Sequence, residues 1–174
     1  MIKLITKNKA KATAPKVSLN KMGTVIHPDV LASAQTINPN SSVSFRKRNS
    51  SKKVLYEWQV SPDSITSPRE INMGISLSSK KVNDLIAKKH INVKYKTIVM
   101  QQLGDLGGKY TIGVRFNLKT FDKNNLKLYS VDLESGEIEK KDQKLEFDEN
   151  TGLLHFQVAY GGIYIVTEGE LNKA

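Results

Sequence analysis

Cysteine is missing from this sequence of 174 residues, and so are long apolar runs. Without cysteine the chain has no disulfide bonds, thiolate zinc sites, iron–sulfur clusters or cysteine nucleophile. This absence does not identify the compartment, because a secreted domain of this size can be stable without disulfides. No apolar run approaches the roughly 20 residues that a membrane-spanning helix needs, so we predict no membrane span.

Catalytic and cofactor-binding motifs are equally scarce. The chain has neither the Gly-x-Ser-x-Gly nor the HExxH motif, and its histidines, His27, His90 and His155, lack metal-ligand spacing. The glycine-rich stretch QQLGDLGGK lacks a Gly-Lys-Ser/Thr ending and precedes a predicted strand, so we interpret it as a loop between strands. We expect no cofactor and no metal site, and predict that the protein is not an enzyme. A hydrolase stays open, because spacing alone cannot show two carboxylates facing each other across a cleft.

The N-terminus carries no recognisable export signal. The apolar patch MIKLI is followed by lysine-rich sequence where the apolar core of a signal peptide should continue. Either the protein stays inside the cell, or the chain is a fragment whose export signal lay upstream or was replaced by the initiating Met. Residues 1–21 hold six lysines and little periodicity, so we expect a flexible basic arm there. After this arm we predict a single β-sandwich domain over residues 22–169 and a tail at residues 170–174.

The net charge of +10 is unevenly distributed. Residues 1–60 carry 11 Lys and Arg against two acids, whereas residues 122–174 carry six Lys against 11 acids. Such asymmetry is typical of a surface that binds polyanions such as nucleic acid, anionic wall polymers or lipid headgroups. A solvated lysine-rich surface is the alternative.

The densest cluster of cations lies between two predicted strands, Val43–Phe45 and Val54–Val60. The loop RKRNSSKK supplies five of the candidate polyanion contacts, which are Arg46, Lys47, Arg48, Lys52 and Lys53. Strand alternation places Tyr56, Trp58 and Val60 on one face. Trp58 is the only Trp, and it is either a core anchor or a ligand platform. A solvated hairpin tip is the alternative interpretation of the loop.

Most of the remaining sequence is typical of short strands with tight turns. We predict a short helix at Asp29–Gln35, another after a Ser78 or Ser79 cap, and strands at Ile71–Ser76, Ile91–Met100 and Tyr110–Leu118. Residues 126–168 read as four short strands, in which DLESGEI and DENTGLL place glycine where a tight turn needs positive φ. The predicted fold is mainly β, an antiparallel β-sandwich with one or two short helices. Any binding site is expected near Arg46–Lys53 or Trp58, outside this terminal segment.

The order of these elements resembles β-rich accessory modules of secreted and surface-attached proteins from Gram-positive anaerobic bacteria. The resemblance covers about Thr24 to Glu168 and rests on VIHPDVLASA, YEWQVSPDSI, INMGISLSS, IVMQQLGDLGGKYTIGVRF, LKLYSVDLESGEIEK and DENTGLLHFQVAYGGIYIV. Gly161-Gly162-Ile163 before Tyr164 departs from the Thr-Asp or Ser-Asp step that is common in such modules. The resemblance implies an extracellular structural or binding role and transfers no site residue, since fold alone would require the matched positions.

Two classes of function therefore lead. The first is a non-catalytic accessory or adhesion module at a bacterial cell surface, with a cell-wall polymer, polysaccharide or surface protein as partner. The second is an intracellular nucleic-acid-binding protein, favoured by the charge of +10 and by the loop Arg46–Lys53. The aromatic residues weigh against the second class, because they occur mostly in strands at core positions rather than beside the cations.

Overall fold

A computed structural model describes residues 16–37 and 41–171. Half of the chain is β-strand and 14% is helix, so the predicted mainly β fold with few helices is confirmed. The strands are β1 (Lys16–Ser18), β2 (Val25–Ile26), β3 (Val43–Arg48), β4 (Val54–Val60), β5 (Ile71–Asn72), β6 (Ile75–Ser76), β7 (Tyr95–Arg115), β8 (Leu126–Val131), β9 (Ile138–Lys141), β10 (Glu146–Asp148) and β11 (Leu153–Glu168). The helices are α2 (Leu19–Met22), α3 (Pro28–Ile37), α4 (Lys80–Lys88) and the 3₁₀ turn η1 (Pro62–Ser64).

Nine of the described strands form one mixed sheet, and β2 and β5 form a separate pair. The large sheet runs in the order β1-β3-β4-β7-β11-β8-β9, with β10 added to β11 and β6 added to β7. All of its pairs are antiparallel except β1 with β3. This sheet is not closed, and the predicted β-sandwich is not confirmed.

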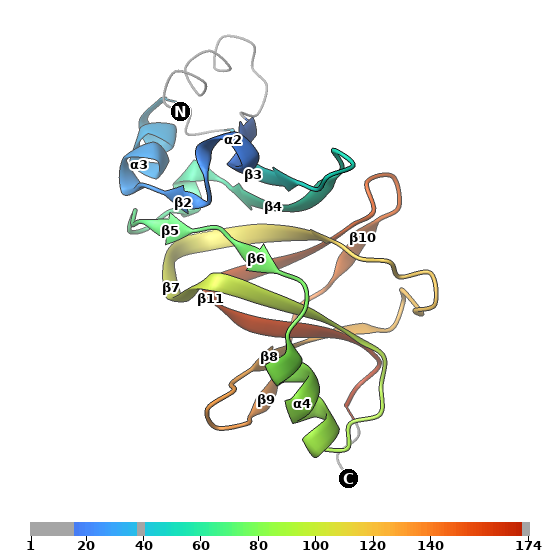
Figure 1. The fold of residues 1–174 in the computed structure, drawn as a ribbon. Helices are drawn as coiled ribbons and strands as arrows, with labels where there is room; N and C mark the ends of the chain where they lie inside the picture. The colour runs from blue at the N-terminus through green and yellow to red at the C-terminus, as the bar shows by residue number, and fades with distance from the viewer. Residues whose placement is uncertain (1–15, 38–40, 172–174) are drawn as a thin grey trace.

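Strands β7 and β11 form a long central ribbon that divides the sheet into two halves (Figure 1). We call the part built from β1, β3, β4, β10 and the paired segments 110–115 and 153–158 the open half. The part built from β6, β8, β9 and the paired segments 95–99 and 163–167 is the covered half. The register shifts twice between the halves, after Val158 and after Gly161.

Glycines make the bend between the halves possible. Gly104 and Gly107 have φ values of +81° and +72°, a region that residues with a Cβ rarely enter. A Cβ on Gly161 would lie only 1.9 Å from the backbone oxygen of Gln102. QQLGDLGGK is therefore part of β7, and its interpretation as a loop is wrong, because these glycines let the strand bulge while it stays paired.

The inner faces of both halves share one core, which also includes residues of α2 and α3. Trp58 lies at its centre with no exposed surface, and its Nε1–H donates to the backbone oxygen of Met73 at 3.0 Å. The Trp58 and Tyr110 rings meet edge to face, with centroids 5.5 Å apart. Trp58 is therefore a core anchor, and its interpretation as a ligand platform is wrong, because no ligand can reach the buried ring.

The outer face of the covered half packs against α4. Val82 and Ile86 of this helix contact Tyr129, Val131 and Ile165, which together form a second apolar cluster. The predicted cap is confirmed at Ser79, whose hydroxyl oxygen accepts from the Val82 N–H at 3.2 Å.

Both predicted acid-and-glycine turns are present. In the first, the backbone N–H of Gly136 donates to the Asp132 carbonyl at 2.8 Å, and Gly152 and Asp148 repeat this contact at 2.8 Å. The two glycines have φ values of +77° and +74°. Hydrogen bonds from the backbone N–H groups of Ser135 and Asn150 hold the pKa values of the Asp132 and Asp148 carboxyls below their ordinary range.

The predicted arm and tail need correction where the structure describes them. Residues 16–21 belong to β1 and α2: β1 pairs with β3, and the apolar side chains of Val17 and Leu19 are buried in the core. Leu171 is tied to the domain by a 3.0 Å hydrogen bond from its N–H to the Tyr129 hydroxyl. The rest of the predicted arm, 1–15, and of the tail, 172–174, lies outside the described residues.

Candidate functional site

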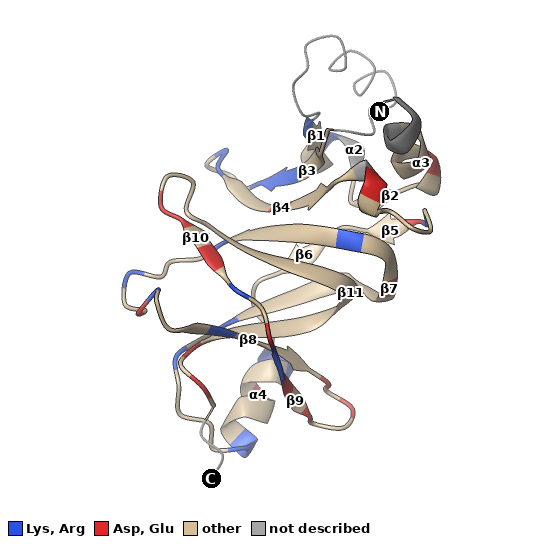
Figure 2. Cartoon of the chain, turned by 180° about the vertical axis from the view of Figure 1, so that it is seen from behind, with Lys and Arg blue, Asp and Glu red and all other residues tan. Residues whose placement is uncertain are grey.

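The outer face of the open half carries a groove of about 620 Å³ between the β3–β4 hairpin and the β10–β11 turn. We call it the cationic groove; its lining residues are Arg46, Arg48, Lys52, Lys53, Val54, Glu57, Arg115, Asp148, Asn150, Thr151, Leu153 and His155. Basic residues along β3 and at the hairpin tip form one side, and the acidic residues of β10 lie on the other (Figure 2). The lining thus contains five Lys and Arg residues and two acidic residues, Glu57 and Asp148.

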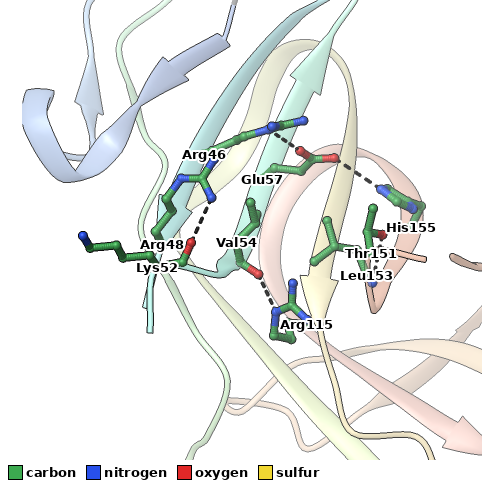
Figure 3. Close-up of polar contacts among 9 residues, drawn as sticks. All are labelled: Arg46, Arg48, Lys52, Val54, Glu57, Arg115, Thr151, Leu153 and His155. Carbon is green, nitrogen blue, oxygen red and sulfur yellow. Dashed lines mark hydrogen bonds and ion pairs between the residues drawn. The ribbon is translucent and has the colours of Figure 1, made fainter. Parts of the chain in front are cut away.

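The floor of the cationic groove is a chain of charged side chains across the sheet. The Arg46 Nε–H donates to Glu57 Oε2 at 3.0 Å, and His155 Nε2 lies 3.3 Å from Glu57 Oε1, as Figure 3 shows. An ionised carboxylate has no proton to give, so the His155 ring donates. Only 8% of the Glu57 side chain is exposed. The hydrogen bond from His155 and the charge of Arg46 outweigh burial and lower the pKa of the Glu57 carboxyl.

A glycine makes room for this contact. Gly113 lies between Glu57 and His155 in the sheet register, paired with each of them. A Cβ at Gly113 would lie 2.9 Å from His155 Nε2 and 3.1 Å from Glu57 Cγ. The two side chains can therefore meet over β7 only because this position has no side chain of its own.

The hairpin tip that carries the other cations is internally hydrogen bonded. The Asn49 side-chain oxygen accepts from the N–H groups of Ser51 and Lys53 at 3.0 and 3.1 Å. Arg48 donates from Nη1 to the Lys52 carbonyl at 3.0 Å, and its own N–H donates to Asn20 Oδ1 at 2.7 Å. These hydrogen bonds hold the backbone of the tip and the Arg48 guanidinium in place, whereas Lys52 extends away from the Glu57 carboxylate (Figure 3).

Arg115 completes the set of cations from β7. Its Nε–H donates to the Val54 carbonyl at 2.7 Å, which holds the guanidinium over the groove (Figure 3). Among the described residues, its Nη1 and Nη2 donate no hydrogen bond within the chain. These N–H groups can donate a pair of hydrogen bonds to a carboxylate, sulfate or phosphate.

Four of the six candidate contact residues come together in this groove: Arg46, Arg48, Lys52 and Lys53. Lys47 is outside the lining, because strand alternation turns it to the face opposite Arg46. Trp58 is in the core, as described above. The hairpin tip is also shorter than the predicted loop, since Arg46–Arg48 belong to β3.

Sequence reasoning misses Glu57, Arg115 and His155 as site residues. Alternation does turn Glu57 away from Trp58 and His155 away from Phe156, which was the available signal. What the sequence cannot supply is the order β4-β7-β11, which brings strands from distant parts of the chain side by side. The terminal segment therefore contributes one side of the groove, contrary to the prediction that a site would lie outside it.

Comparisons with protein-family models, with curated proteins and with solved structures find no match for this chain. Within residues 16–37 and 41–171, no group of three or more His, Asp or Glu side chains is placed to hold a metal ion. In the same part of the chain, no helix has the length and apolar character needed to cross a membrane. The chemistry that the groove offers is a set of charged N–H donors directed at one open surface.

Proposed function

We propose that this protein is a non-catalytic module that binds an anionic polymer in the cationic groove. The observation that carries the proposal is the convergence of Arg46, Arg48, Lys52, Lys53 and Arg115 on one surface with two carboxylates. One of those carboxylates, Glu57, is already engaged by Arg46 and His155. The field over the groove is therefore positive, and it favours a negatively charged ligand.

The shape of the groove supports a polymer over a small anion. Its cations come from β3, the hairpin tip and β7, so they are distributed over several segments of the chain. A single small anion would contact only one or two of these side chains. A chain of repeated charges can engage all of them, and each phosphate-type contact adds to affinity and to its dependence on salt.

The location and the wider role belong to the same proposal. An extracellular accessory module at a bacterial surface is supported by the resemblance of Thr24–Glu168 and by the net charge of +10, which favours retention on an anionic wall. A sandwich-like arrangement, with the open and covered halves as its layers, is supported by the core that the halves share.

Nucleic acid is a less favoured ligand of the groove. No Phe, Tyr or Trp side chain is among the lining residues, whereas proteins that bind single strands combine cations with aromatic platforms for the bases. Binding of nucleic acid would then rest on backbone charge alone.

The test is a binding titration of the full chain with fluorescently labelled polygalacturonate at low and moderate salt. The groove variant Arg48→Gln/Lys53→Gln/Arg115→Gln should weaken binding at least about tenfold and reduce the salt dependence. The matched control is Lys81→Gln/Lys88→Gln/Lys89→Gln, which removes the same charge from exposed positions on and just after α4. Equal weakening by both variants, or no binding at low salt, would overturn the proposal.

A further inference from the structure

Beside the cationic groove, one step along the strands, lies a row of neutral polar side chains. Gln59, Thr111 and Gln157 pair across β4, β7 and β11, and we call them the polar row. They point outward like Glu57 and His155, two residues away on the same strands. Within the described residues, the side chains of the polar row make no hydrogen bond to the protein. Their donors and acceptors are therefore free for a ligand.

The polar row forms the floor of a second hollow, of about 220 Å³. Ser42, Ser61, Ser64 and Lys109 surround it. Hydroxyls and amides predominate here, and Lys109 supplies the only charge in the lining. This second hollow is thus suited to a neutral polar part of a ligand, in contrast to the cationic groove next to it.

A third hollow, of about 380 Å³, begins at Gln157 and continues along β11 to Tyr164. It includes Tyr160, which is 61% exposed. The Gln143 side-chain amide donates to the Gln157 carbonyl at 2.7 Å and accepts from its N–H at 2.8 Å. Gln143 therefore occupies the strand edge at Gln157 and leaves the Gln157 side chain facing the hollows.

Residues of β11 line all three hollows, and the third also includes Val158 and Tyr164, whose side chains belong to the shared core. Leu153 and His155 line the first, Gln157 lines the second, and Gln157 to Tyr164 line the third. At about 3.4 Å per residue, the four steps from residue 153 to residue 157, which lie before the register shift after Val158, span roughly 14 Å. A surface of this length and polarity fits an extended oligomer.

We propose that these hollows form one track for an anionic polysaccharide, with its acidic groups in the cationic groove and its hydroxyls on the polar row. This inference rests on the proposed function and names the ligand class. Sugar hydroxyls both donate and accept hydrogen bonds, and so match amides and a threonine hydroxyl, which do the same. A polymer that offers only charged acceptors, such as polyphosphate, cannot use the acceptors of the polar row. Tyr160 offers an exposed ring against which a sugar can lie.

The test compares two polymers on the same variant of the full chain. Gln59→Ala/Thr111→Val/Gln157→Ala should weaken polygalacturonate binding about tenfold, since three hydrogen-bonding groups are lost. Polyphosphate binding should change by less than about twofold, because the cationic groove is intact. The matched control is Asn92→Ala, an exposed amide outside the three hollows. Thermal unfolding shows whether each variant is folded, and Gln157→Ala alone replaces the triple variant if it is not.

The outcomes separate the two proposals. If the polar-row variant binds polygalacturonate as the unmodified chain does, while Arg48→Gln/Lys53→Gln/Arg115→Gln weakens both polymers, the glycan inference is overturned and the polyanion function stands. If that groove variant leaves polygalacturonate binding unchanged, the proposed function fails. Tighter binding of oligothymidylate than of polygalacturonate would also overturn the glycan inference.

Discussion

The open and covered halves of the sheet share β7 and β11, yet their outer faces are chemically opposite. In the covered half, outward positions such as Tyr129 and Ile165 are apolar and lie under α4. In the open half, outward positions such as Gln59 and Gln157 are polar, and the buried Glu57 is compensated by charge. One pair of strands thus serves as core on one side of the bend and as a candidate binding surface on the other.

The difference shows how a small change of side-chain pattern decides where a site can form. Val166, Tyr164 and Phe156 all face the shared core, so the inner face of β11 is apolar in both halves. Only the alternate positions differ, with Ile165 at one end and Gln157 at the other. An apolar alternate position requires cover, and α4 provides it; a polar one can stay open and bind.

The largest expected effect is the loss of stability in Ile165→Ala, which we compare with Gln157→Ala on the same outer face of β11. Ile165→Ala removes a fully buried side chain from the cluster with Val82 and Ile86, and should lower the free energy of unfolding by about 4 kcal/mol. Gln157→Ala, in the open half of the same strand, should change it by less than about 0.5 kcal/mol. Urea unfolding of both variants measures the contrast. Similar losses from the two substitutions would mean that the outer faces are not energetically different.

A slightly smaller effect is expected at the bend that joins the halves. Gly161→Ala places a Cβ 1.9 Å from the Gln102 backbone oxygen, so the ribbon must shift, at a cost of about 3 kcal/mol. Gly162→Ala is the neighbouring control, because a Cβ there meets nothing within 4 Å. Thermal unfolding should show a clear fall in Tm for the first variant and little change for the second. If both variants melt together, close approach at Gly161 does not hold the bend.

The sequence predicts the local elements of both halves better than their assembly. The helices at α3 and α4, the pairing of β3 with β4, and the turns at Gly136 and Gly152 follow from caps, alternation and glycine positions. The 21-residue length of β7 does not, because its glycines resemble loop residues until the pairing with β11 is known. The candidate site shares this limit, since four of its cations are neighbours in the sequence whereas Arg115 and His155 join them only through strand order.

The smallest expected effect concerns Glu57, the one acidic side chain on the floor of the cationic groove. Glu57→Gln removes the charge that Arg46 and His155 compensate, and should lower the free energy of unfolding at pH 7 by about 2 kcal/mol. Glu70→Gln is the matched control, because Glu70 also faces a histidine, His27 at 3.5 Å, but both side chains are largely exposed. Its effect should be small, as for most exposed ion pairs.

The effect of Glu57→Gln should also depend on pH in a defined direction. Because the pKa of Glu57 is lower in the folded state, its carboxylate contributes stability that is fully present well above the ordinary pKa of about 4.3. This contribution is lost as the pH falls through the lowered value. Urea unfolding between pH 7 and pH 3 should therefore show that the free energies of unfolding of the unmodified protein and of Glu57→Gln converge at the acid end. A gap that stays constant over this range would mean that Glu57 stabilises the open half by packing, and that its charge is not what holds the floor of the groove together.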